Sequence, residues 1–196
     1  MSTQAAPSRA GMNGASPLCS RHTFVVHVED RPGVLDRVAS LFRRRSYNIE
    51  SLTVGRTDKA GVSRMTIVME GDDTTARLME ANLYKLVNVL HVENVTYKPA
   101  VIRDLALIKV RAAAEVRAQV LQVSDVFRAR VVDIGPDALI VEITGTDDKI
   151  QGLVEVLEPY GILEMVRTGV VAMTRGAEVT DVEPQFIPAR APESAA

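Results

Sequence analysis

The sequence contains few of the residues that mark disulfide-bonded, metal-binding or nucleic-acid-binding proteins. Its 196 residues include a single cysteine, Cys19, so neither a disulfide framework nor a cysteine-based metal cluster can form within one chain. Tryptophan is absent and aromatic residues make up only 4%, which argues against a surface that stacks nucleic-acid bases. The formal net charge is -2, from 23 basic and 25 acidic residues. No basic field therefore attracts the chain to phosphate backbones or anionic membranes.

Long apolar runs are also missing, and none approaches the length of a membrane span. Residues 1–21 are rich in Ala, Ser, Pro and Gly and lack the apolar centre of a secretory signal. We expect them to form a disordered tail, with a short organellar transit segment as the alternative. One cysteine fits a reducing compartment, and we expect a cytoplasmic protein.

What the sequence does have is an alternation of strand and helix patterns that occurs twice. Hydrophobic residues make up 46%, enough for a substantial core. In residues 22–98, apolar residues recur at strand or helix spacing in the order βαββαβ. The predicted strands are 22–29, 47–56, 62–70 and 88–97. One predicted helix follows Asp30–Gly33 and ends in the basic cluster Arg43–Arg45. The other follows the turn Gly71–Thr74.

The same order returns in residues 99–176, after a boundary marked by Pro99. Predicted strands are 104–112, 129–134, 138–144 and 161–173, with one helix around Val116–Phe127 and another capped by Thr146 and Asp147. The fold class is therefore α+β, with two consecutive βαββαβ modules. We expect the polar segment 177–196 to be disordered.

A βαββαβ module has an antiparallel sheet with both helices on one face. The other face must be solvated or covered by a partner. We expect Val25, Arg64, Thr66 and Val68 to lie on that open face. Such a mixed surface suits pairing of modules side by side or face to face, so we expect a dimer.

The loop between the first strand and the first helix has the residues of an anion site. Free N–H groups at a helix start attract a carboxylate, and Gly33 permits close approach to the backbone. Asp30 can accept a hydrogen bond from an ammonium group, Asn48 offers donors and an acceptor, and Val34 and Leu35 can line an aliphatic pocket. Together these features suit a free amino acid. The alternative is that Asp30 only caps the helix and Asn48 only ends a loop.

Catalytic and metal-binding patterns are absent from the sequence. The histidines His22, His27 and His91 have separations that fit no compact metal motif, and each falls on a predicted strand. No nucleophile elbow, P-loop or dinucleotide fingerprint occurs. We therefore assign no catalytic and no metal-binding residue.

Several segments resemble the small regulatory subunit of acetolactate synthase (acetohydroxyacid synthase). Residues 44–54 read RRSYNIESLTV and 63–67 read SRMTI, while 83–89 read LYKLVNV. In the second half, residues 105–110 (LALIKV) and 167–176 (RTGVVAMTRG) are similar to the opening and closing strands of that family's second domain. The resemblance covers residues 22–176.

The resemblance implies an N-terminal ACT domain, which is an amino-acid-binding βαββαβ module, followed by a second ferredoxin-like domain. It implies a non-catalytic regulatory chain that binds the large catalytic subunit, which carries thiamine diphosphate, magnesium and usually FAD. The chain would activate that enzyme of valine, leucine and isoleucine synthesis and confer feedback inhibition, usually by valine.

The family's effector residues fall on the loop up to Leu35 and on Asn48 and Ile49. The resulting set of effector-binding residues is Asp30, Gly33, Val34, Leu35, Asn48 and Ile49. The family often has Asn in place of Asp30, which leaves the choice of effector open. A free-standing amino-acid sensor of the same fold, acting on another enzyme, is the alternative function, and a small enzyme on this fold is a third. Binding to a large thiamine-diphosphate enzyme separates the first from the second.

Overall fold

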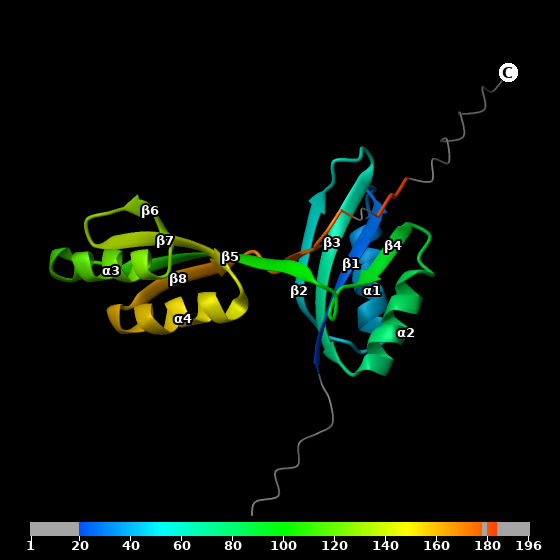
Figure 1. The fold of residues 1–196 in the computed structure, drawn as a ribbon, viewed down its shortest axis with the longest axis horizontal. Coiled ribbons are helices and arrows are strands. Elements are labelled where there is room, and N and C mark those ends of the chain that lie inside the picture. The colour runs from blue at the N-terminus through cyan, green and yellow to red at the C-terminus, as the bar shows by residue number, and fades with distance from the viewer. Residues whose placement is uncertain (1–19, 178–179, 184–196) are drawn as a thin grey trace, which may run out of the picture.

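The computed structural model describes residues 20–177 and 180–183, and within them it confirms the two βαββαβ modules (Figure 1). The first module contains β1 (Ser20–Glu29), α1 (Val34–Arg44), β2 (Ile49–Arg56), β3 (Val62–Gly71), α2 (Asp73–Leu83) and β4 (Val89–Asn94). Its antiparallel sheet has the order β2-β3-β1-β4, so β2 and β4 are its edges.

The second module contains β5 (Ala100–Arg111), α3 (Ala114–Val126), β6 (Arg130–Ile134), β7 (Ala138–Gly145), α4 (Asp147–Leu157), a short 3-10 helix (Glu158–Tyr160), β8 (Ile162–Arg167) and β9 (Val171–Thr174). The order β6-β7-β5-β8 repeats the topology of the first sheet, and β9 pairs with the start of β5.

The last strand was predicted as one run over 161–173, and this prediction is wrong. The chain breaks between β8 and β9 because Gly169 has a φ of +87°, outside the range of a strand. The opening residues of β5, Ala100–Arg103, pair with β9, while the rest of β5 pairs with β7 and β8. Figure 1 shows the start of β5 reaching from the second module to the first. A two-stranded ribbon therefore connects the modules.

Each module has its own core, formed by alternating strand residues and one stripe from each helix. In the first module Phe24, Val26 and Val28 of β1 pack against the buried residues of α1 and α2. In the second module, Ala106, Ile108 and Val110 of β5 pack in the same way against the buried residues of α3 and α4. The two clusters share no residue.

The helix starts differ from the predicted capping. Asp30 does not cap α1: its N-cap residue is Gly33, with no side-chain hydrogen bond. Thr146 is the N-cap residue of α4 but its side chain makes no capping bond. Asp72 does cap α2, because its carboxylate accepts from the Thr75 N–H at 2.7 Å. That hydrogen bond holds the pKa of Asp72 below its usual value.

The open face of the first sheet is covered by the chain's own C-terminal segment, which corrects the expectation of solvent or a partner there. Val25 of β1 packs with Val95 and with Ala172 of β9. The Arg64 guanidinium donates to the Ala172 carbonyl, and Lys59 pairs with Asp181. This segment therefore occupies the part of the open face around Val25 and Arg64 that was expected to be available for pairing. Within the described residues, no helix is long and apolar enough to cross a membrane.

Because the cores are separate, damage to one should stay local. Ile67 and Ile143 are each at most 1% exposed and belong to different cores. We expect Ile67→Ala to destabilise the first module by about 2–5 kcal/mol and Ile143→Ala to do the same to the second. Hydrogen exchange read by mass spectrometry gives the opening free energy of each module. Equal loss of protection in both modules from either variant would contradict independent cores.

Candidate functional site

The predicted effector loop lies at the end of β1, where the chain turns into α1. The Asp30 N–H donates to the Gly61 carbonyl at 2.8 Å, which ties the loop to the turn before β3. The Asp30 carboxylate lies 3.1 Å from Nε of Arg56, the last residue of β2. Asp30 thus stands exposed at the surface with one cationic neighbour instead of capping the helix.

The start of α1 has the free donors that the anion hypothesis requires. Gly33 adopts a φ of +83°, and a Cβ added to it would meet no atom within 4 Å. In the described part of the chain, the N–H groups of Leu35 and Asp36 have no acceptor. Leu35 is 44% exposed, whereas Val34 is 3% exposed and packs in the core. Leu35 is therefore the aliphatic side chain that faces outward here, whereas the side chain of Val34 points into the core of the module.

Asn48 and Ile49 lie at the opposite end of the sheet from this loop. Ile49 pairs with Met69 of β3, and Met69 pairs with His22 near the start of β1. From His22 to Glu29, the last residue of β1, the strand rises by roughly 23 Å. The structure therefore does not bring Asn48 and Asp30 together within one chain. Asn48 is exposed, and Ile49 packs partly against the core.

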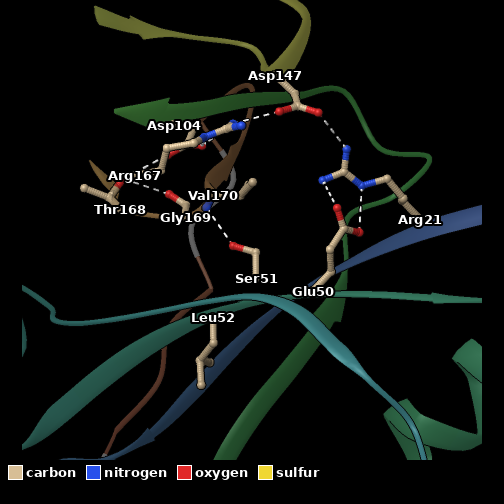
Figure 2. Close-up of a pocket in the computed structure, with 10 residues that line it drawn as sticks. All are labelled: Arg21, Glu50, Ser51, Leu52, Asp104, Asp147, Arg167, Thr168, Gly169 and Val170. Carbon is tan, nitrogen blue, oxygen red and sulfur yellow. Dashed lines mark hydrogen bonds and ion pairs between the residues drawn. The ribbon is translucent and has the colours of Figure 1, made fainter. Parts of the chain in front are cut away.

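A cleft between the two modules, with a volume of about 380 Å³, is lined by Glu50, the residue that follows Ile49 (Figure 2). A chain of charged side chains crosses it. Arg21 of β1 contacts Glu50 through Nε at 2.9 Å and through a terminal nitrogen at 2.6 Å. Its other terminal nitrogen lies 3.2 Å from Asp147 of α4. Asp147 also accepts from Arg167 at 2.7 Å, and Arg167 donates through Nε to Asp104 at 2.7 Å.

Asp147 is the carboxylate that two arginines share. One oxygen accepts from Arg167 of its own module and the other from Arg21 of the first module. The hydrogen bond from Arg167 holds the pKa of Asp147 below its usual value. Every charged group drawn in Figure 2 has a partner of opposite sign, so none of the five offers an unpaired charge to a ligand. We call this contact region between the two modules the joint.

Backbone contacts close the joint beside the charges. The Val170 N–H donates to Ser51 Oγ at 2.9 Å. A Cβ placed on Gly169 would lie 2.7 Å from Ser51 Oγ and 3.2 Å from Thr53 Oγ1. No side chain fits there without a shift. The segment Thr168–Val170 therefore lies directly against β2.

Sequence reasoning did not find these joint residues. One signal was available: Gly169 interrupts an apolar run of strand character, and such a glycine often marks close approach of another backbone. The ion pairs had no comparable signal, because Arg21 and Asp147 are far apart in the sequence. Among the described residues, no group of His, Cys, Asp or Glu side chains is arranged to hold a metal ion.

Comparison with known proteins places both modules in one family. Residues 24–91 match the AHAS small subunit-like ACT domain, and residues 103–176 match the small subunit of acetolactate synthase. The chain is 48% identical over 156 residues to a probable acetolactate synthase small subunit of Archaeoglobus fulgidus, covering 80% of this chain and 98% of that protein. It is 48% identical over 155 residues to an acetolactate synthase small subunit of Mycolicibacterium smegmatis, covering 79% and 91%.

A solved structure agrees with these sequence matches. The acetolactate synthase small subunit of Thermotoga maritima superposes with a TM-score of 0.75 at 37% identity, covering 81% of this chain and 99% of that one.

We expect Gly169→Ala to loosen the joint, because the new Cβ collides with Ser51. Spin labels on Val87→Cys and Val126→Cys, both exposed and one in each module, with Cys19→Ser in the background, would report the distance between the modules. The distance distribution should lengthen or broaden. Gly176→Ala is the matched control, since Gly176 has a φ of +103° but open space around its Cβ. An unchanged distribution in Gly169→Ala would contradict the contact.

Proposed function

The chain belongs to the acetolactate synthase small-subunit family, and on that premise we propose that it activates the catalytic subunit and makes it sensitive to feedback inhibition by a branched-chain amino acid. Valine is the expected effector. Thiamine diphosphate, magnesium and FAD are expected in the catalytic partner, and this chain is expected to work beside it in the cytoplasm without catalysing a reaction itself.

The observation that carries the proposal is the exposed start of α1. A free amino acid has a carboxylate, an ammonium group and a side chain. The N–H groups of Leu35 and Asp36 suit the carboxylate, the Asp30 carboxylate suits the ammonium group, and the exposed Leu35 suits an aliphatic side chain. Arg56 Nε lies 3.1 Å from the Asp30 carboxylate and orients it.

We place the rest of the site on a second copy of the chain. Asn48 and Asp30 are too far apart in one chain for a single amino acid to touch both. The edge strand β2 runs from Ile49 to Arg56, and Arg56 lies beside Asp30. If the β2 edges of two copies pair antiparallel about a two-fold axis, Asn48 of one copy comes next to Arg56 and Asp30 of the other. A homodimer through the first modules would then hold two equivalent sites.

Inhibition follows from such a site by linkage. The effector must bind the inhibited arrangement of subunits better than the active one, because equal affinity for both would shift nothing. A site built from two copies meets this requirement, since its occupancy depends on how the copies pack.

We expect Gly33→Asp to abolish valine inhibition while preserving activation. The new carboxylate occupies the open space at the helix start and repels the carboxylate of the effector. The measurement is acetolactate formation by the catalytic subunit, with and without this chain, titrated with valine, leucine and isoleucine. If the unaltered chain does not change acetolactate formation by the catalytic subunit, the proposed function itself is wrong.

Gly33→Asn is the matched control for size and backbone strain. Asn has the shape of Asp without its charge and tolerates the positive φ of Gly33 equally well. Inhibition should be lost more completely in Gly33→Asp than in Gly33→Asn. Full valine sensitivity in Gly33→Asp would refute the assignment of the site.

A mixing experiment tests whether the site is shared between copies. Gly33→Asp and Asn48→Ala chains should each bind valine weakly alone. In a mixed dimer one site carries both substitutions and the other carries neither, so calorimetry should recover about one intact site per mixed dimer. If Asp30 and Asn48 served one site within a single chain, every site would carry one substitution and mixing would restore nothing.

A further inference from the structure

We infer that the chain of ion pairs from Glu50 through Arg21 to Asp147 transmits effector occupancy at Asn48 and Ile49 to the second module. The inference rests on the proposed function, because it begins at the proposed effector residues. It assigns positioning roles to side chains that contact neither effector nor substrate.

The first step of transmission takes place within β2, from the proposed effector residue Ile49 to Glu50. Glu50 directly follows Ile49, and the pairing of β2 with β3 shifts register between Ile49 and Ser51. Glu50 is therefore the extra residue of a β-bulge, opposite no partner on β3. Bulges redirect a side chain and bend the strand locally. Here the redirected carboxylate meets the Arg21 guanidinium through two contacts, at 2.9 Å and 2.6 Å, which fixes its direction as well as its distance.

The second step crosses from one module to the other. Arg21 holds Glu50 with one side of its guanidinium and reaches Asp147 with the other, at 3.2 Å. Asp147 is the first residue of α4, so its carboxylate is attached to a rigid helix of the second module. A displacement of the Glu50 backbone therefore alters the position of Arg21, and through it the preferred position of α4.

The far end of the chain of contacts is anchored. Asp147 is held by Arg167, and Arg167 is held by Asp104, whose side chain is only 5% exposed. By contrast, the Arg21 and Asp147 side chains are 43% and 48% exposed. The contact between the modules joins two exposed side chains at 3.2 Å and is longer than the 2.6 Å and 2.7 Å contacts on either side of it, so it is the weakest ion pair of the network.

A second contact leads from the same end of β2 to the same module. The Val170 N–H donates to Ser51 Oγ, and Gly169 lies against the same hydroxyl. Ser51 therefore contacts the second module directly, whereas Glu50 reaches it through Arg21. A displacement at the start of β2 acts on both contacts.

The test uses Arg21→Gln, which keeps hydrogen-bonding capacity but removes the charge, and Asp147→Asn. Glu164→Gln is the matched control, because Glu164 forms an exposed pair with Lys109 at 3.1 Å inside the second module. Valine binding to each full chain is measured by calorimetry. Valine inhibition is measured with the catalytic subunit, and the distance between modules with the spin labels at positions 87 and 126.

Arg21→Gln and Asp147→Asn should bind valine within about twofold of the unaltered chain, while valine's effect on activity weakens by up to about fivefold, the size expected of one exposed ion pair. The change in module distance on adding valine should shrink in parallel. The double variant should lose less than the sum of the two single losses, because both substitutions remove the Arg21–Asp147 bond, while Arg21→Gln also removes the pair with Glu50 and Asp147→Asn the pair with Arg167. Glu164→Gln should behave as the unaltered chain.

Two results would overturn the inference. Unchanged valine inhibition in Arg21→Gln and Asp147→Asn would show that the ion pair transmits nothing. Loss of valine binding itself would place Arg21 in the effector site instead of the transmission path. Failure of the proposed function is a separate result, because it is read on the unaltered chain: no branched-chain amino acid would bind, or none would inhibit.

Discussion

The antiparallel register of the first sheet is the constraint on which the arrangement of this chain depends. β2 runs along β3, and β3 runs along β1, in a pairing that puts the start of β2 level with the start of β1. The loop Asp30–Gly33 lies at one end of the sheet and Asn48 at the other. The two segments therefore cannot meet within one chain. If both bind one effector, as we propose, the need for a partner copy comes from this register and not from a shortage of suitable side chains.

The same register explains why the second module is attached where it is. Arg21 near the start of β1, and Glu50 and Ser51 near the start of β2, are brought to one end of the sheet, where α4 and the Thr168–Val170 segment approach (Figure 2). Asn48 lies at this end too. An edge available to a second copy and a joint to the second module thus adjoin the same few residues of β2. Short-range strand geometry is enough to relate them, without a long path through the core.

The sequence was sufficient to predict features that depend on local chemistry. Apolar periodicity predicted both βαββαβ modules, because burying one stripe of each helix and one side of each strand requires it. The turn predicted before the second helix contains Asp72, which caps α2; a capping carboxylate acts on an N–H only a few residues away, so such a turn is visible in local sequence. Residues 1–19 and 184–196, where most of each predicted disordered tail falls, lie outside the described part of the chain, and the predicted module boundaries stay predictions.

Features set by contacts between distant segments were not predictable in this way. The local pattern made Asp30 a helix cap, but Arg56 lies beside its carboxylate through the pairing of β2 with β3. The break at Gly169 was read as continuous strand because its neighbours are apolar, although the contact that needs a glycine comes from Ser51. The open face of the first sheet was expected to be solvated or covered by a partner. No sequence pattern indicated that Ala172 would cover Val25.

That covering segment has a consequence for how the chain is made. Synthesis runs from the N-terminus, and N-terminal domains generally fold first as they leave the ribosome. β1 to β4 are complete long before β9 is translated. Val25 and Val95 therefore stay uncovered while the second module is still being synthesised, and they are closed off only when Ala172 and the residues after it emerge. The open face of the first module is covered only after β9 has been synthesised. A nascent chain that stops before β9 therefore exposes an apolar patch that the full-length protein buries.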